Sequence, residues 1–295
     1  MISIVICSAN KDLLKQVSEN IAVTIGVPYE IIAINNSLEK KSICAVYNKG
    51  ILKAQYSTLC FMHEDIIIKT NNWGQLIVSL FNNDPQLGLV GVAGSTYKPL
   101  SPSGWRGFDT DTTYLNIIQS SRHNPTQSRL DHLNPTNESL AKVTAIDGVW
   151  FCTTKSIARE FMFDEATFKE FHGYDVDFSL SVGTKYKVAV TFEVLLDHFS
   201  EGNYNKTWIQ ETLKLHLKWH RHLPINIDNQ VSTKQSIHIE KKTFRDFTDQ
   251  LSRLNYPINT IFTLLWKNNR FLKLNALLFC KLNFYLVKKM LKPQK

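Results

Sequence analysis

Cysteine is scarce in this sequence and occurs in no C-x-x-C pair. The five cysteines are isolated from one another, and three of them lie in apolar, strand-like runs, where a thiol packs as a small hydrophobe. This spacing argues against a disulfide framework. The pattern predicts reduced core thiols in a cytosolic protein.

Long apolar runs and a leader peptide are also missing. No stretch approaches the roughly 18 uncharged apolar residues of a spanning helix, which argues against an integral membrane protein. The first residues carry no basic leader and no small-residue cleavage site, so we expect no secretory signal. Neither G-x-G-x-x-G nor a Walker loop occurs, so a dinucleotide or P-loop site is not supported. We therefore expect a cytoplasmic protein.

The composition is that of a folded chain. It has 295 residues, of which 43% are hydrophobic and 11% aromatic, and these fractions exclude a mostly disordered protein. The length fits one large domain or two small ones. A core of this size needs no metal or disulfide to hold it together.

Positive charge is concentrated in the last fifth of the chain. Residues 241–295 contain 12 Lys and Arg against 2 Asp and Glu, whereas residues 1–240 contain 22 against 24. A catalytic domain that grips nucleic acid would be basic across its working face, so we expect no nucleic-acid partner. The distribution instead predicts a basic helical C-terminal extension, which we place at 225–295.

The end of this extension has the pattern of an amphipathic helix. At roughly 100° per residue, its apolar and basic side chains fall on adjoining faces. Such a surface, within 256–295, could contact an anionic membrane, its own domain, another subunit or a protein partner, and the sequence leaves these alternatives open. The apolar face comprises Phe271, Leu274, Leu278, Leu282, Tyr285 and Leu286, and the basic stripe comprises Lys273, Lys281, Lys288, Lys292 and Lys295.

Strand-like and helical segments alternate in the first third of the chain. Continuous apolar runs at this spacing predict parallel βαβ units and hence an α/β fold with a mainly parallel sheet. Polar clusters follow three of the runs, at 8–10, 35–37 and 63–65. Because ligands bind at the carboxyl ends of parallel strands, we expect these clusters to converge on one crevice. The expected strands are 2–7, 30–35, 58–62 and 87–94, and the expected helices reach about residue 24 and span 42–55 and 73–83.

The segment 95–142 has a different character. It is rich in Ser, Thr, Asn, Pro and Gly and has few periodic apolar positions, which predicts an irregular lid or substrate loop. Strand-like pattern returns at 142–154, and 206–222 has a helical pattern.

Five motifs occur in an order that resembles one enzyme family. They are YNKGILKAQYSTLCFMHED at 47–65, AIDGVWF at 145–151, FHGYDVDFSL at 171–180, DHFSEGN at 197–203 and LKWHRHLP at 217–224. From about residue 2 to 224 the chain resembles an inverting glycosyltransferase of the GT-A fold, in the large family 2 group. Its nearest likeness is to the bacterial glycosyltransferase-like branch with HxD in place of DxD. The resemblance implies a GT-A domain at 1–224.

The resemblance also implies a divalent metal. Asp65 matches the second Asp of D-x-D, the direct ligand in the family, and His198 matches the family's distal His ligand. His63 stands where the family has the first Asp. Hard oxygen ligands suit Mg²⁺ or Mn²⁺, and an imidazole favours Mn²⁺. A bound metal would stabilise the charge of the departing nucleoside diphosphate.

Asp175 matches the family's catalytic base, which removes the proton from the acceptor hydroxyl. The alternative for Asp175 is a structural role as the N-cap of the following helix. Tyr174 replaces the Glu that precedes the base in the family. The other residues assigned to the donor or acceptor sugar are Asp147, Gly148, Trp105 and Lys218; a purely structural role for Asp147 and a solvated helix face for Lys218 stay open.

The nucleotide site is assigned to the polar residues that follow the first strands and to one helix. Asn36 stands where the family has an Asp that binds the base, and an amide, which both donates and accepts, suits uracil and leaves other bases open. UDP is therefore the favoured nucleotide. The assigned residues are Ser8, Asn10, Asn36, Asn48 and Glu64.

Together these inferences predict an enzyme that moves a sugar, with inversion, from a nucleotide donor to a hydroxyl. The expected acceptor is a glycan or a lipid-linked saccharide, which places the protein in the cytoplasm or on the inner face of the cytoplasmic membrane. One alternative is a non-catalytic glycan- or nucleotide-binding protein on the same fold. A scaffold that docks through its basic tail is a second, and a nucleotidyltransferase is a weaker third because a basic Gly-rich phosphate loop is absent.

Overall fold

The structure is a computed structural model that describes residues 1–38, 40–121, 128–200 and 204–291. Its first third alternates strand and helix as the apolar runs predict: β1 (Ile2–Ser8), α1 (Lys11–Thr24), β2 (Tyr29–Asn35), α2 (Ile43–Lys53) and β3 (Thr58–Met62). The side chains of Asn10 and Ser42 cap the two helices by accepting hydrogen bonds from their first-turn N–H groups. α1 therefore begins directly after the cluster at 8–10, whereas α2 begins at Ile43, beyond the loop that follows the cluster at 35–37.

The main sheet is mixed and has the strand order β10-β13-β5-β12-β3-β1-β2. Its remaining strands are β5 (Leu87–Gly91), β10 (Leu140–Val143), β12 (Trp150–Thr154) and β13 (Lys187–Thr191). β1 pairs in parallel with β2 and β3, and β13 pairs in parallel with β5. β12 runs antiparallel between β3 and β5 and so joins the two parallel parts of the sheet. The carboxyl ends of β1 and β3 thus open on the same edge, as the spacing predicts.

A second sheet lies against this edge, with the order β11-β6-β8-β14-β4 and β9 paired to β8. Its strands are β4 (Ile66–Ile68), β6 (Ala93–Ser95), β8 (Thr113–Ser120), β9 (Ser128–Leu133), β11 (Ala145–Ile146) and β14 (Leu196–Phe199), while β7 (Tyr97–Lys98) pairs with β15 (Ile225–Asn226). The segment 95–142 is therefore more regular than its composition predicts. The reason is that β8 buries polar side chains, among them Thr113, Asn116 and Ser120, so hydrophobic periodicity does not reveal it.

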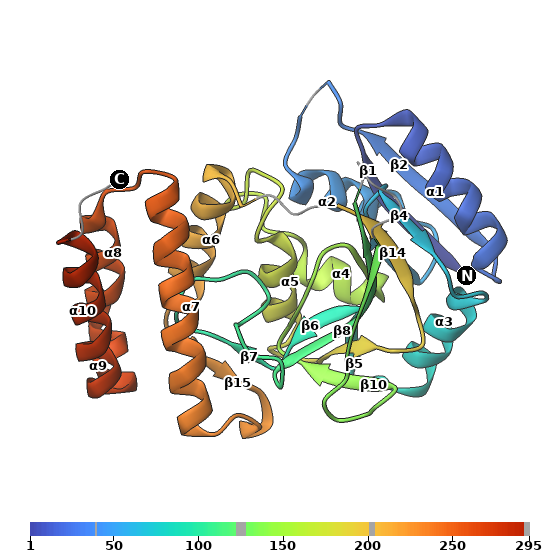
Figure 1. Ribbon diagram of the computed structural model, residues 1–295. Coiled ribbons are helices and arrows are strands. Elements are labelled where there is room, and N and C mark those ends of the chain that lie inside the picture. Colours follow the sequence, from blue (N-terminus) through green and yellow to red (C-terminus); the bar gives the residue numbers. More distant parts are fainter. Residues whose placement is uncertain (39, 122–127, 201–203, 292–295) are drawn as a thin grey trace.

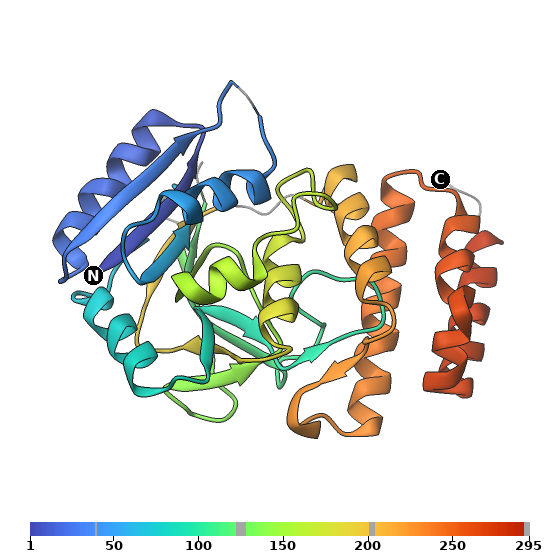
Figure 2. The ribbon, with the colours of Figure 1, turned by 180° about the vertical axis from the view of Figure 1, so that it is seen from behind.

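Helices cover the sheets and extend the molecule at one end. They are α3 (Trp73–Asn83), α4 (Lys155–Phe161), α5 (Tyr174–Val182), α6 (Lys206–Trp219), α7 (Thr233–Arg253), α8 (Ile258–Trp266), α9 (Arg270–Leu274) and α10 (Ala276–Met290), with short 3-10 turns at Ile227–Asn229 and Lys267–Asn269. Figures 1 and 2 show α8, α9 and α10 at the end of the molecule opposite α1 and β2, with α7 between them and the sheets. The α/β class with a C-terminal helical extension is confirmed.

The extension packs on the rest of the chain through an apolar core of its own. Ile209 of α6 and Leu223 belong to the same buried cluster as Phe244 and Phe247 of α7. Of the predicted apolar face, Phe271, Leu278, Leu282 and Leu286 are buried, but Asn275 interrupts the helix between α9 and α10. Lys292 and Lys295 of the predicted basic stripe lie outside the described residues. Within the described part of the chain, none of the helices has both the length and the apolarity to span a bilayer.

Candidate functional site

A cavity of about 1360 Å³ opens where the two sheets meet. One side is formed by the ends of β1 and β3, with Cys7, His63 and Asp65, and by His198 of β14. The start of α5 contributes Asp175 to its floor. The opposite side is formed by the loop 102–108 and by α6 and α7. The cavity thus lies at the carboxyl ends of β1 and β3, where two of the polar clusters reach it. The third cluster, 35–37, instead contributes Asn35 and Asn36 to a separate, smaller pocket with Lys41 and Lys49, so the predicted convergence of all three clusters is wrong.

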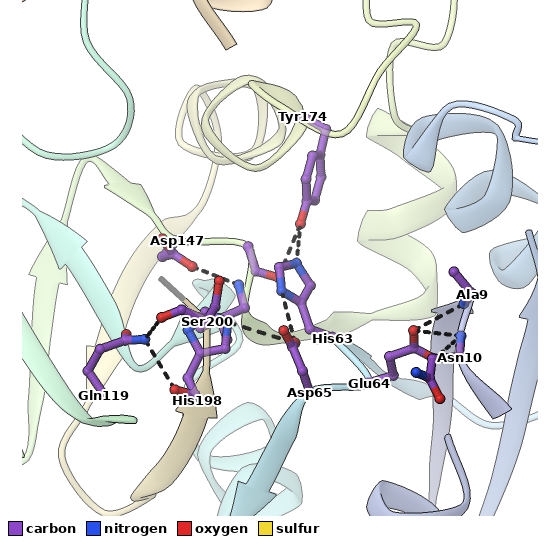
Figure 3. Close-up of polar contacts among 12 residues, drawn as sticks. Ala9, Asn10, His63, Glu64, Asp65, Gln119, Asp147, Tyr174, His198 and Ser200 are labelled. Atoms are coloured by element: carbon purple, nitrogen blue, oxygen red, sulfur yellow. Dashed lines mark hydrogen bonds and ion pairs between the residues drawn. The ribbon is translucent and has the colours of Figure 1, made fainter. Parts of the chain in front are cut away.

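His63, Asp65 and His198 form a compact group at this cavity. One donor atom from each lies within 4.8 Å of the others. Asp65 Oδ1 is 3.8 Å from His63 Nδ1 and 3.8 Å from His198 Nε2 (Figure 3). Two imidazoles and one carboxylate suit a divalent transition ion such as Mn²⁺ better than Mg²⁺, which prefers oxygen ligands alone. The donor set therefore fits a metal of this kind.

Gln119 of β8 supports the third member of the group. Its side-chain amide donates to the carbonyl oxygens of His198, at 3.1 Å, and Ser200. β14 also pairs with β4, which places His198 opposite Ile66, next to Asp65. The backbone at His198 is therefore held by β8 on one side and by β4 on the other.

Tyr174 joins this group to the loop before β12. Its hydroxyl lies 3.2 Å from His63 Nε2 and donates to the carbonyl oxygen of Gly148, also at 3.2 Å (Figure 3). The hydroxyl occupies the space that a side chain at position 148 would need, because a Cβ there would lie 2.1 Å from it. The Tyr that replaces the family's Glu thus contacts the metal-site candidate directly.

Asp175 faces the same loop from the first turn of α5. Its Oδ2 accepts a hydrogen bond from the N–H of Gly148 at 3.0 Å. Burial and the nearby charge of Asp147 raise the pKa of Asp175 to about 7, although backbone hydrogen bonds oppose the shift. A carboxylate with a pKa near neutrality is suited to take a proton. Asp147 itself lines the cavity and accepts a hydrogen bond from the N–H of Val149 at 2.8 Å.

The predicted nucleotide residues at the first loop act partly through backbone contacts. Glu64 lines the cavity and accepts hydrogen bonds from the N–H groups of Ala9 and Asn10, at 3.1 and 3.0 Å. The side chain of Asn10 caps α1, and Ser8 is buried at the end of β1. Ala9, between them, lines the cavity. The loop therefore reaches the cavity, but the polar side chains of Glu64 and Asn10 hold it in place.

Asn36 and Asn48 are engaged within the protein. The side-chain amide of Asn36 donates to the carbonyl oxygen of Lys41 and accepts from its N–H, both at 2.8 Å, and so holds the loop 36–41 together. The amide of Asn48 makes a similar pair with the backbone of Phe163, at 2.9 and 2.8 Å. Gly50 of the same motif packs on Val5, where a Cβ would meet a methyl group at 2.3 Å. The Asn-x-Gly motif thus positions α2, and we do not retain Asn48 as a nucleotide ligand.

Lys218 is paired away from the site. Its ammonium group donates to Asp164 and Asp177, at 2.8 and 2.9 Å. Burial opposes its charge, but these hydrogen bonds outweigh that effect and raise the pKa of Lys218. We therefore do not retain it as a partner of the diphosphate. Trp105 and Gly148, in contrast, both line the cavity.

Sequence reasoning missed the wall that the C-terminal extension contributes. Asp246, Gln250 and Arg253 of α7 line the cavity together with Trp208 of α6. The basic charge of residues 241–295 predicts an appendage, whereas the packing of α7 places it in the wall of the cavity. The boundary at residue 224 separates segments that share one cavity.

Buried polar contacts fix this wall to the loop that carries Trp105. Glu240 of α7 is fully buried and accepts hydrogen bonds from the N–H groups of Leu100 and Ser101, at 2.7 and 2.8 Å. The buried Lys98 ammonium group contacts Ser103 and Nε2 of His216, both at 2.8 Å. Burial lowers the pKa of Lys98 to about 7, against the opposing charges of Glu240 and Asp175. The loop is therefore anchored to both α6 and α7.

Comparison with known proteins bears on the fold and family. The model of a glycosyltransferase-like family matches residues 3–222. A crystal structure of GalNAc-T7 with UDP, GalNAc and Mn²⁺ matches with a TM-score of 0.51 and 12% identity over 73% of this chain and 47% of that one. The chain thus spans about half the length of that protein. Residues 1–349 of S. aureus TarS match with a TM-score of 0.47 and 10% identity, over 96% and 91% of the two chains.

Among curated proteins, no sequence matches this chain. The family match nevertheless covers most of the residues that form the cavity, including His63, Asp65, Asp175 and His198. The fold of this chain is also similar to that of the GalNAc-T7 structure. The chain therefore has a GT-A fold and belongs to the glycosyltransferase-like family.

Proposed function

We propose that this protein transfers a sugar from a nucleoside diphosphate donor to an acceptor hydroxyl, with inversion at the anomeric carbon. One observation carries the proposal: the His-Asp-His group and Asp175 lie on one cavity and are linked through Tyr174 and Gly148. Asp65 contacts His63, and Tyr174 connects His63 to Gly148, whose N–H binds Asp175. These contacts hold the metal-site candidate and the base candidate in fixed positions relative to each other.

The first half of the reaction concerns the departing diphosphate. His63, Asp65 and His198 would hold Mn²⁺, in keeping with the Mn²⁺ and UDP named for the GalNAc-T7 structure. A bound divalent ion supplies positive charge that stabilises the leaving diphosphate. The first loop and Glu64 form the adjoining part of the cavity, which we assign to the nucleotide, with UDP favoured.

The second half concerns the acceptor. As its hydroxyl oxygen attacks the anomeric carbon, Asp175 takes the hydroxyl proton, the bond to the diphosphate breaks, and the configuration inverts. The raised pKa of Asp175 suits this role because the carboxylate then binds a proton readily near neutral pH. Asp147 lies beside the base and offers an acceptor for sugar hydroxyl groups.

We place the acceptor saccharide between the loop 102–108 and helices α6 and α7. Trp105 and Trp208 offer aromatic faces in this part of the cavity, and Asp246 and Gln250 offer hydrogen-bonding groups. Apolar faces with a few placed polar groups are the usual lining of small-molecule sites. The C-terminal extension then supplies part of the acceptor site.

Thermal unfolding with UDP, GDP or other nucleoside diphosphates, each with Mn²⁺, Mg²⁺ or EDTA, tests the donor site. A ligand that binds only the folded state raises the melting temperature. We expect a Mn²⁺-dependent rise with UDP that Asp65→Ala abolishes and that Asp175→Asn keeps. Donor-sugar hydrolysis should fall in Asp175→Asn. No rise with any nucleotide contradicts the proposal, and binding without turnover in the unmodified protein favours the non-catalytic alternative.

The outer layer formed by α8, α9 and α10 suggests where the enzyme works. Residues 256–295 contain eight Lys and Arg and no Asp or Glu, which equals the formal net charge of +8 for the whole chain. Large apolar side chains are exposed on the same layer, including Trp266 at 54% and Phe284 at 71%. Basic residues beside exposed aromatic ones suit an anionic lipid surface, so we assign this layer to peripheral membrane contact, close to a lipid-linked acceptor.

Flotation with phosphatidylglycerol and phosphatidylcholine vesicles tests this contact. We expect binding to the anionic vesicles alone, weakened by salt because surface charges are screened. The pair Lys281→Glu and Lys288→Glu should abolish it, whereas Lys15→Glu on the distant α1 should not. Equal binding to both vesicles, or none, contradicts membrane contact and leaves a protein partner for this layer.

A further inference from the structure

His63 is held by a residue that the proposed reaction does not use. Its Nε2 faces the Tyr174 hydroxyl at 3.2 Å, while its Nδ1 faces Asp65 Oδ1 at 3.8 Å. The two ring nitrogens therefore point to different partners, one inside the protein and one at the metal-site candidate. Which nitrogen carries the proton decides whether the ring can bind a cation there.

The single hydrogen of the Tyr174 hydroxyl determines which nitrogen of His63 carries a proton. A phenol has one proton to donate, and a carbonyl oxygen can only accept, so the contact of 3.2 Å with Gly148 uses that proton. Toward His63 the hydroxyl then acts as an acceptor, which requires a proton on Nε2. A neutral ring with its proton on Nε2 has its lone pair on Nδ1, the atom that faces Asp65.

The opposite tautomer leaves a group unsatisfied. If Nε2 carried no proton, then the Tyr174 hydroxyl would face two acceptors with one hydrogen, and either Gly148 or His63 would lose its hydrogen bond. Tyr174 is buried, so such a loss would cost about 1 to 3 kcal/mol.

The position of Tyr174 is itself fixed. Its ring packs edge-on against Tyr47, with centroids 5.7 Å apart, and it opens α5 directly before Asp175. Gly148 is held from both sides, because its carbonyl accepts from Tyr174 and its N–H donates to Asp175. The hydroxyl therefore presents a rigid acceptor to His63.

We infer that Tyr174 is a positioning residue that fixes the tautomer and the orientation of His63, so that Nδ1 is the nitrogen offered to the metal. The inference rests on the proposed function only in that the group at His63 binds a cation. Partners of this kind, which bind the second nitrogen of a metal-binding His, change metal affinity by about 10- to 100-fold. Tyr174 itself would touch neither the metal nor the reacting atoms.

Two measurements on the full chain test the inference. The first is the ¹⁵N NMR signature of His63 in the metal-free protein, assigned by its loss in His63→Ala, which reports the protonated nitrogen directly. The second is Mn²⁺ binding, measured by electron paramagnetic resonance. Tyr174→Phe keeps the ring and removes the hydroxyl. Tyr114→Phe is the matched control, because it removes the hydroxyl of another buried Tyr, on β8.

We expect His63 protonated on Nε2, Mn²⁺ binding weakened about 10- to 100-fold in Tyr174→Phe, and unchanged binding in Tyr114→Phe. A proton on Nδ1 in the metal-free protein overturns the inference, and so does wild-type Mn²⁺ affinity in Tyr174→Phe. If the unmodified protein binds no Mn²⁺, then the metal part of the proposed function fails. The NMR signature still decides the role of Tyr174 in that case, and also if Tyr174→Phe does not fold.

Discussion

Replacing Asp175 by Asn should separate catalysis from nucleotide binding. Asn keeps the shape of the side chain and an oxygen that can accept from the N–H of Gly148, but it cannot take a proton. Removal of a general base typically costs 10²- to 10⁴-fold in rate. We therefore expect Asp175→Asn to lower transfer by about this factor while nucleotide binding is kept.

The same change should stabilise the protein at high pH. In the folded state the pKa of Asp175 is raised from 3.8 to about 7, first by burial and then by Asp147. Between these values the folded protein binds a proton that the unfolded chain releases, so stability falls as the pH rises through this window. At about 1.4 kcal/mol per unit, the loss amounts to at most about 4 kcal/mol and is complete above pH 7. Asn does not titrate and escapes this loss.

Chemical denaturation at a series of pH values measures the effect. We expect the unfolding free energies of the two proteins to differ least near pH 4 and most above pH 7, with Asp175→Asn the more stable. Transfer by the unmodified enzyme should rise with pH and level off above about 7, because the base must be unprotonated. A stability difference that does not change between pH 4 and 8 would refute the argument, since Asp175 would then not titrate near neutrality.

Three further changes test other parts of the site. Asp65→Ala should abolish Mn²⁺ binding measured by calorimetry, and the unmodified protein should bind Mn²⁺ more tightly than Mg²⁺; the reverse order would contradict a site with two imidazoles. Glu240→Ala strands the N–H groups of Leu100 and Ser101 and should lower the unfolding free energy by about 2 to 6 kcal/mol, at about 1 to 3 kcal/mol for each stranded group, whereas no loss in denaturant titration would show that the anchor is dispensable. Gly148→Ala places a Cβ 2.1 Å from the Tyr174 hydroxyl, so it should lower the unfolding free energy by about 1 to 3 kcal/mol and remove most of the transfer activity. Full activity in a sugar-transfer assay would mean that the contact between Tyr174 and Gly148 does not position the base.

The sequence by itself determined the α/β frame and much of the candidate site. Apolar runs at regular spacing predicted β1 and β3, because strands buried on both faces need continuous apolar residues. The run at 30–35 also predicted a buried strand, but β2 lies at the edge of the sheet and is only partly buried. The rule that ligands bind at strand ends, together with the order of the motifs, pointed to Asp65, Asp175 and His198. These residues line one cavity.

Only the tertiary structure decided which polar side chains are available at that cavity. Asn48 and Lys218 carry the right chemistry, but each has its hydrogen bonds satisfied inside the protein, by Phe163 and by Asp164 and Asp177. Such partners are distant in the sequence, and a motif does not reveal them.

The role of the extension was also decided by packing. Its charge suggested an appendage, but α7 carries Glu240 into a buried contact with the loop at 100–101 and brings Arg253 to the cavity. A buried carboxylate is stable only where donors meet it, and those donors are backbone N–H groups, which have no sequence signature. The sequence therefore shows where the basic residues lie along the chain. Only the fold shows that part of the same extension, α7, forms a wall of the cavity.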